Sequence, residues 1–126
     1  MKEVDLGMHI ILNFYGCDSS KLNDYDFLKK TVDEILDKMK VSKIGEMNYK
    51  FEPVGLTYVI GIKESHISIH TWPERGEATI DIYTCGKESP LLGYEILVEK
   101  LKPKTVDAIF IDRRTMSIVF KKRETF

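Results

Sequence analysis

The sequence predicts an α+β fold, a two-layer sandwich in which an antiparallel β-sheet carries two main helices on one face. Two segments repeat apolar residues at three- and four-residue steps, which is typical of amphipathic helices. Other segments are β-branched or alternate in polarity, and short turns join most of them, which favours antiparallel pairing. The length of 126 residues suits one core, so a single domain spanning 1–126 is expected.

The elements are expected in the order strand, helix, four strands, helix and two strands. A first strand at 9–15 precedes a turn rich in side chains that can cap a helix. The helix at 25–40 is predicted by apolar residues at Leu28, Val32, Ile35, Leu36 and Met39. Strands follow at 46–52, at 56–62, within 63–76 and at 77–85, where Gly86 ends the run. A second helix at 91–101 ends before Pro103, and strands at 105–111 and 116–120 close the chain.

Composition and charge exclude several classes of partner. The chain has 19 Lys plus Arg against 20 Asp plus Glu, so it lacks the basic excess typical of nucleic-acid binding. Its apolar runs fall far short of the roughly 18 residues of a membrane span, and its first residues do not resemble a signal peptide. Cys17 and Cys85 are therefore expected to be reduced thiols in a cytoplasmic protein.

The stretch KESHISIHTWPERGEA, residues 63–78, carries more polar groups than a core strand needs. One interpretation is zinc binding by His66, His70 and Cys85, with Cys17 or His9 as a fourth ligand, but the spacing does not favour it and no metal is expected. Another is a hydrolase in which Ser65 is the nucleophile and His70 the base, but the Gly-x-Ser-x-Gly frame is absent.

Strand geometry adds an objection to the hydrolase. If 65–72 is one regular strand, Ser65 lies on the face of Ile67 and Ile69, opposite His66, Ser68 and His70. Ser65 and His70 then meet only through a bend, a bulge or a break in the chain.

The motifs ESHISIHTWPE (64–74) and DIYTCG (81–86) resemble the self-processing pyruvoyl decarboxylases, in particular the short prokaryotic S-adenosylmethionine decarboxylases. The segments NFYGCD (13–18), KLNDYDFL (21–28) and KFEPVG (50–55) are similar to family segments and occur in the same order. The resemblance covers roughly residues 7–86 and is weaker in the last third of the chain.

The resemblance implies that Ser65 attacks the carbonyl of Glu64 and that the chain splits into a β chain, 1–64, and an α chain, 65–126. Ser65 becomes a covalent pyruvoyl group, which forms the Schiff base with substrate and replaces a dissociable cofactor. Before cleavage, the Glu64–Ser65 bond is expected to have an irregular conformation. His70 matches the processing base and Cys85 the proton donor, while Thr57 occupies a position where the family usually has serine.

The implied substrate is S-adenosylmethionine, decarboxylated to supply aminopropyl groups for spermidine and other polyamines. Substrate contacts are expected from Phe51, Glu74, Ile67 and Tyr15, with Phe51 stacking on adenine and Glu74 holding the ribose hydroxyls. Met8 and Tyr49 depart from the family pattern, as does Thr57. These departures leave open an arginine or ornithine decarboxylase. A non-enzymatic homologue that binds adenosine ligands or activates a partner is a separate alternative, and the presence of Ser65, His70 and Cys85 does not favour it. The resemblance also implies a homodimer of processed units.

Overall fold

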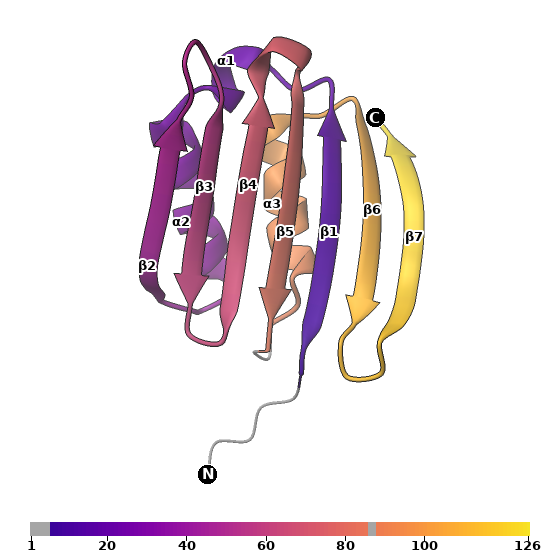
Figure 1. Ribbon diagram of the computed structural model, residues 1–126. Coiled ribbons are helices and arrows are strands. Elements are labelled where there is room, and N and C mark those ends of the chain that lie inside the picture. The colour runs from indigo at the N-terminus through magenta and orange to yellow at the C-terminus, as the bar shows by residue number, and fades with distance from the viewer. Residues whose placement is uncertain (1–5, 86–87) are drawn as a thin grey trace.

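The computed structural model describes residues 6–85 and 88–126, and it confirms the expected two-layer α+β sandwich. Within these residues, seven strands form one sheet in the order β2-β3-β4-β5-β1-β6-β7, with every neighbouring pair antiparallel (Figure 1). The strands are β1 (Met8–Tyr15), β2 (Lys43–Lys50), β3 (Leu56–Ile62), β4 (Ser65–Trp72), β5 (Glu77–Thr84), β6 (Thr105–Asp112) and β7 (Ser117–Thr125). The first strand therefore lies inside the sheet, between β5 and β6.

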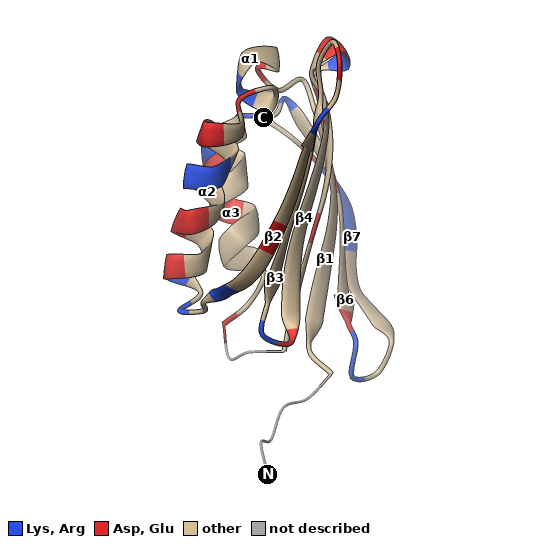
Figure 2. Ribbon diagram, turned by 60° about the vertical axis from the view of Figure 1, so that its left-hand side comes forward, with Lys and Arg blue, Asp and Glu red and all other residues tan. Residues whose placement is uncertain are grey.

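The helices are α1 (Ser19–Leu22), α2 (Tyr25–Lys38) and α3 (Leu91–Leu101), and a 3-10 turn, η1, spans Pro73–Arg75. The Asp24 side chain caps α2 by accepting a hydrogen bond from the backbone N–H of Phe27 at 3.1 Å. Figure 2 shows α2 and α3 on the same side of the sheet, and no described helix covers the opposite side, which we call the open face. None of the described helices is long and apolar enough to cross a membrane.

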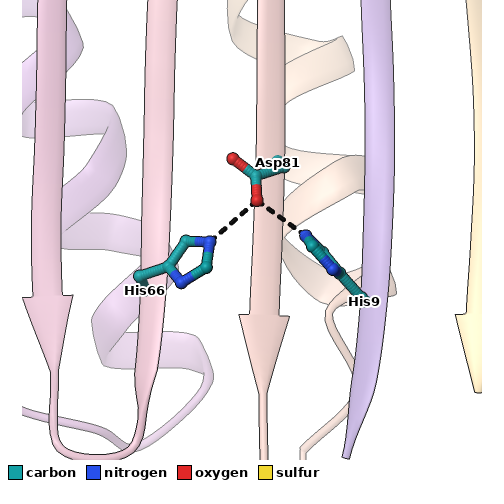
Figure 3. Close-up of side chains that lie close together, drawn as sticks. All are labelled: His9, His66 and Asp81. Carbon is teal, nitrogen blue, oxygen red and sulfur yellow. Dashed lines mark hydrogen bonds and ion pairs between the residues drawn. The ribbon is translucent and has the colours of Figure 1, made fainter. Parts of the chain in front are cut away.

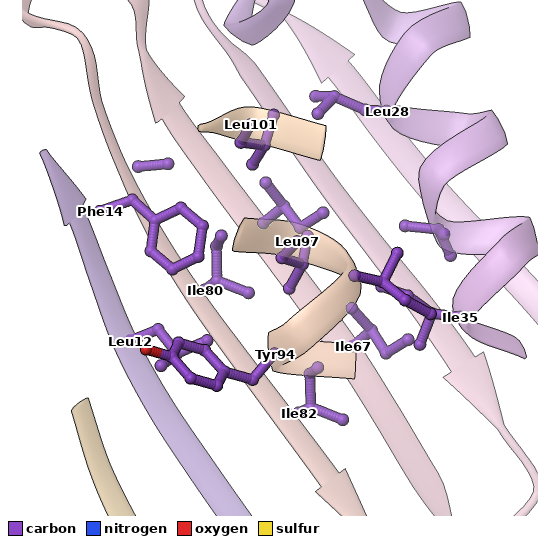
Figure 4. Packing of buried hydrophobic residues seen from close by; sticks show 14 of the residues in the cluster. Leu12, Phe14, Leu28, Ile35, Ile67, Ile80, Ile82, Tyr94, Leu97 and Leu101 are labelled. Carbon is purple, nitrogen blue, oxygen red and sulfur yellow. The ribbon is translucent and has the colours of Figure 1, made fainter. Parts of the chain in front are cut away.

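The core lies between the sheet and the two long helices, because alternate strand residues point toward the helices (Figure 4). Gly93 of α3 allows a close approach, since a Cβ atom there would lie 2.4 Å from Ile82 Cδ1 and 3.2 Å from Ile35 Cγ2. The labelled core residues are Leu12, Phe14, Ile67, Ile80 and Ile82 of the sheet, Leu28 and Ile35 of α2, and Tyr94, Leu97 and Leu101 of α3.

Several predicted boundaries are wrong by a few residues. The second strand is 43–50 and not 46–52, because it is an edge strand whose residues are almost all exposed and leave no burial pattern. The last strand continues to Thr125 and not to residue 120, although its end is charged. The helix expected at 25–40 ends at Lys38, and α1 and η1 were not predicted. Gly86, expected to end the strand at 77–85, lies outside the described residues.

Candidate active site

The bond between Glu64 and Ser65 lies in the tight turn that joins β3 to β4. Ile62 pairs with Ser65, so Lys63 and Glu64 form the turn. Glu64 has a φ of 67°, in the left-handed region that non-glycine residues rarely occupy and that costs on the order of 1–3 kcal/mol. The backbone is therefore irregular at Glu64, as expected, whereas Ser65 already belongs to the regular strand.

Cys85 lies against both sides of this peptide bond. Its thiol donates a hydrogen bond to the carbonyl oxygen of Glu64, with a distance of 2.8 Å from Sγ to the oxygen. Its backbone N–H donates to the hydroxyl of Ser65 at 3.3 Å. Three predicted site residues, one of them 20 positions from Ser65 in sequence, thus come together at the end of the sheet where β3 turns into β4.

Thr57 and His70, each predicted to take part in processing, lie at the other end of the sheet. The two residues are cross-strand partners on the open face, and Thr57 Oγ1 lies 3.0 Å from His70 Nδ1. Since Ser65 and His70 are both in β4, their separation is roughly 16 Å at the usual rise of a strand. Within one chain, the structure does not bring His70 to Ser65.

A cavity of about 370 Å³ lies beside the Thr57–His70 pair. Phe51 and Glu74, two of the predicted substrate contacts, both line it. Phe51 is 47% exposed, and its ring packs against Tyr49 with the ring centroids 4.8 Å apart, so the exposed part of the ring can still stack with a ligand. The sheet thus carries two groups at opposite ends: the cleavage group, Glu64, Ser65 and Cys85, and the cavity group, Phe51, Thr57, His70 and Glu74.

Two predicted substrate contacts do not join the cavity group. The Ile67 side chain is fully buried on the helix side of the sheet and does not reach the open face, so a substrate contact by this residue stays a prediction. Tyr15 is not among the described residues that line the cavity. Its hydroxyl donates to Asp107 at 3.2 Å, and the Arg123 guanidinium lies 5.9 Å from its ring centroid.

The residues considered for zinc separate in the structure. His66 and His9 converge on Asp81 of β5, with Nε2 to Oδ2 distances of 2.7 and 2.6 Å (Figure 3). His70 pairs instead with Thr57, and Cys85 with the Glu64 carbonyl. Cys17 is buried, and this burial raises the pKa of its thiol to about 12, which disfavours the thiolate that a metal needs. The ligand set suggested by sequence is thus not assembled.

Asp81 is the centre of a polar cluster on the open face. Burial opposes its charged form, but hydrogen bonds from His9, Ser68 and His66 outweigh burial and hold the pKa of this carboxyl well below its ordinary value. A carboxyl whose pKa is lowered on folding stabilises the protein above its unfolded pKa, and this contribution is lost as the pH falls toward the folded value.

Asp81→Asn is therefore expected to lower the free energy of unfolding by about 1–3 kcal/mol at pH 7, because charged hydrogen bonds are lost. The difference from wild type should shrink as the pH falls below about 4, where the unfolded carboxyl is protonated. Urea unfolding of both proteins at a series of pH values measures this difference in the free energy of unfolding. A deficit that stays constant down to pH 3 would show that the charge of Asp81 is not what stabilises the fold.

Sequence reasoning missed Asp81 and Tyr83. The Tyr83 hydroxyl lies 3.3 Å from the Cys85 sulfur and donates to the Leu6 carbonyl at 2.6 Å. Both residues alternate with the buried Ile80 and Ile82, so they look like ordinary outward positions of a strand. The available signal was that they share the parity of Cys85, which directly follows β5.

The fold and the site together define a class of protein: an α+β sandwich with one open sheet face, in which a serine, a carbonyl and a thiol meet at a hairpin turn. Comparison with known proteins identifies the family within this class. Residues 8–114 match the family model described as S-adenosylmethionine decarboxylase, and the chain belongs to this family.

Individual relatives agree with this assignment. The chain is 39% identical to the S-adenosylmethionine decarboxylase proenzyme of Sulfurihydrogenibium sp. over 92% of this chain and 88% of that one. It is 41% identical to the proenzyme of Geobacillus kaustophilus, over 94% of this chain and 96% of the relative. Among solved structures, the adenosylmethionine decarboxylase of Aquifex aeolicus superimposes with a TM-score of 0.78 at 35% identity, covering 86% of this chain and 90% of that one.

Proposed function

We propose that this protein decarboxylates S-adenosylmethionine with a pyruvoyl group that it makes from its own Ser65, and so supplies aminopropyl groups for polyamine synthesis. Family membership supports the activity. The observation that carries the self-processing step is the meeting of the Ser65 hydroxyl, the Glu64 carbonyl and the Cys85 thiol at one left-handed turn. The two free cysteines suit a reducing compartment, and we place the protein in the cytoplasm.

In the cleavage step, Ser65 Oγ attacks the carbonyl carbon of Glu64 and negative charge develops on the carbonyl oxygen. Cys85 suits the stabilisation of that charge, because its S–H already donates to this oxygen. The peptide bond becomes an ester, and removal of the Ser65 α-proton expels the Glu64 carboxylate and leaves dehydroalanine. Addition of water then releases ammonia and leaves the pyruvoyl group at the start of 65–126, with 1–64 as the other fragment.

His70 is the proposed base for this step, but its distance from Ser65 requires a second chain. The open face lacks a helix layer, and its two ends carry the cleavage group and the cavity group. In a two-fold homodimer, the open faces of two chains could pack together with their ends reversed. The cavity group of each chain would then lie against the cleavage group of its partner, which makes two sites. We therefore propose a homodimer with two composite sites, in which Thr57 orients His70 through their 3.0 Å contact.

The pyruvoyl group supplies a carbonyl that accepts electrons when carbon dioxide leaves the amine-linked substrate. Phe51 offers an exposed ring for the adenine, and Glu74, exposed in η1, offers carboxylate oxygens for the ribose hydroxyls. Cys85 returns a proton to the substrate carbon. A thiol suits this role, because its S–H group can donate a proton.

Release of labelled carbon dioxide tests the substrate. We expect turnover of carboxyl-labelled S-adenosylmethionine and none of arginine or ornithine at the same concentration. Phe51→Ala should raise the KM for S-adenosylmethionine about tenfold, because loss of one base–aromatic stack costs about 1–3 kcal/mol. Turnover of arginine or ornithine in preference to S-adenosylmethionine would overturn the substrate assignment while leaving the cleavage chemistry intact.

A further inference from the structure

The cluster of His9, His66 and Asp81 has a geometry that the proposed reaction does not use. One ligand atom from each residue lies within 4.8 Å of the other two, and no other such group of three His, Cys, Asp or Glu occurs in the described part of the chain. In the single chain the three side chains are 15%, 41% and 23% exposed, respectively. Figure 3 shows them facing one another across three neighbouring strands, and the proposed homodimer would enclose them between the two open faces.

Three adjacent strands fix the positions of these side chains. His9 in β1 and His66 in β4 are both register partners of Tyr83, and Asp81 lies two residues earlier on the same β5 strand. The two imidazoles therefore flank the carboxylate from either side on one face of an antiparallel sheet. Ser68 donates a hydrogen bond to Oδ1 of Asp81, which leaves Oδ2 directed at the two Nε2 atoms. Hydrogen bonds of this kind, from a neighbouring side chain to a ligand, orient the ligands of metal sites.

We propose that His9, His66 and Asp81 form a binding site for one divalent transition-metal ion of the Zn²⁺ and Co²⁺ type. Two imidazole nitrogens and one carboxylate oxygen are a donor set that these ions take with three protein ligands, and water commonly completes such a site. Mg²⁺ and Ca²⁺ require oxygen ligands and are poorly matched. None of the three ligand residues has a role in the proposed decarboxylation.

The contact of Arg113 with His9 is expected to lower the affinity of the site for a metal ion. Its Nη1 atom lies 3.3 Å from His9 Nδ1. A guanidinium can only donate, so in this arrangement His9 accepts at Nδ1 and carries its proton on Nε2. A metal ion at Nε2 moves that proton to Nδ1, where it faces the guanidinium. Metal binding is therefore expected to displace Arg113 from His9, and Arg113→Gln should bind the ion more tightly than wild type.

The site would also join the two products of cleavage. His9 belongs to the segment 1–64, whereas His66 and Asp81 belong to 65–126. An ion held by all three would link β1 to β4 and β5 across the cut chain.

Co²⁺ titration of the purified full chain, followed by visible absorption, tests the proposal. We expect a saturable absorption band at one Co²⁺ per chain that Zn²⁺ removes and millimolar Mg²⁺ does not. His9→Gln, His66→Gln and Asp81→Asn should each weaken binding by more than about tenfold, and Ser68→Ala by about 10–100-fold. His70→Gln is the matched control, because it removes the remaining histidine of the chain from the same face, and it should leave the Co²⁺ affinity unchanged.

Circular dichroism of each variant separates loss of a ligand from loss of the fold. The absence of a Co²⁺ band in folded wild-type protein would overturn the proposal. Binding that survives His9→Gln and Asp81→Asn, or that disappears in Cys85→Ser, would overturn it as well, because the ion would then lie elsewhere.

Discussion

Ser65→Ala is expected to leave the chain uncut at 14.6 kDa and to abolish decarboxylation. The hydroxyl oxygen of Ser65 is the proposed nucleophile that attacks the Glu64 carbonyl carbon. The same oxygen accepts a hydrogen bond from the backbone N–H of Cys85. Without that hydroxyl neither the ester nor the carbonyl derived from it can form. Denaturing gel electrophoresis follows cleavage, and labelled carbon dioxide release follows activity.

Ser117→Ala is the control for this experiment, because Ser117 is an exposed serine at the start of β7, far from the turn in sequence and in the sheet. It should be cut and active like wild type. A Ser65→Ala protein that is still cut after residue 64, or that still releases carbon dioxide, would remove Ser65 from the chemistry.

Co-expression of Ser65→Ala with His70→Ala is expected to restore activity that neither variant has alone. Each homodimer of a variant lacks one essential group at both sites. In a mixed dimer, the Ser65 of one chain meets the His70 of the other, so one of the two sites is complete. Random pairing therefore predicts about a quarter of the wild-type activity in a two-fold dimer. Assays of each variant alone give the baseline.

No recovery in mixed dimers, shown to be present by different affinity tags, would contradict the composite site. Full activity of His70→Ala alone would remove His70 from processing. The same assay therefore distinguishes the two claims. Lack of recovery in mixed dimers contradicts the dimer arrangement, whereas activity of His70→Ala alone contradicts the role of His70.

The fold was predictable because its long elements have clear periodicity. The helix α2 places Leu28, Val32, Ile35 and Leu36 at three- and four-residue steps, and these residues are buried together in the structure. The elements that were misjudged are those without such a pattern. The edge strand β2 is exposed nearly throughout, and the charged residues Lys121, Lys122 and Arg123 extend β7 as an edge strand.

The residues of the candidate site could be proposed from the sequence, but only part of their geometry could be predicted. Strand parity correctly placed Ser65 opposite His70, and the separation of the two residues along β4 follows from the same reasoning. The contact of Cys85 with Glu64 depends on β5 pairing with β4, and the cluster around Asp81 depends on β1 pairing with β5. No local sequence pattern specifies how strands that are distant in sequence pair, so neither contact could be derived from the sequence.

The open face is the surface that a second chain would cover in the proposed homodimer. It combines exposed apolar side chains such as Ile11 with the charged cluster at Asp81, so a partner covering it must accommodate both. This mixture of apolar and charged side chains suits an interface that contains active sites. An interface with only a structural role would not favour it, because buried charges stabilise association only when they are paired.

The intact mass of the wild-type protein under denaturing conditions tests the central claim most directly. Self-processing predicts two species, residues 1–64 and residues 65–126, the second lighter by one ammonia than a chain that begins with serine. A single species at 14.6 kDa that persists on long incubation would contradict it. Two fragments with an unmodified serine at the start of the second would show cleavage without formation of the pyruvoyl group.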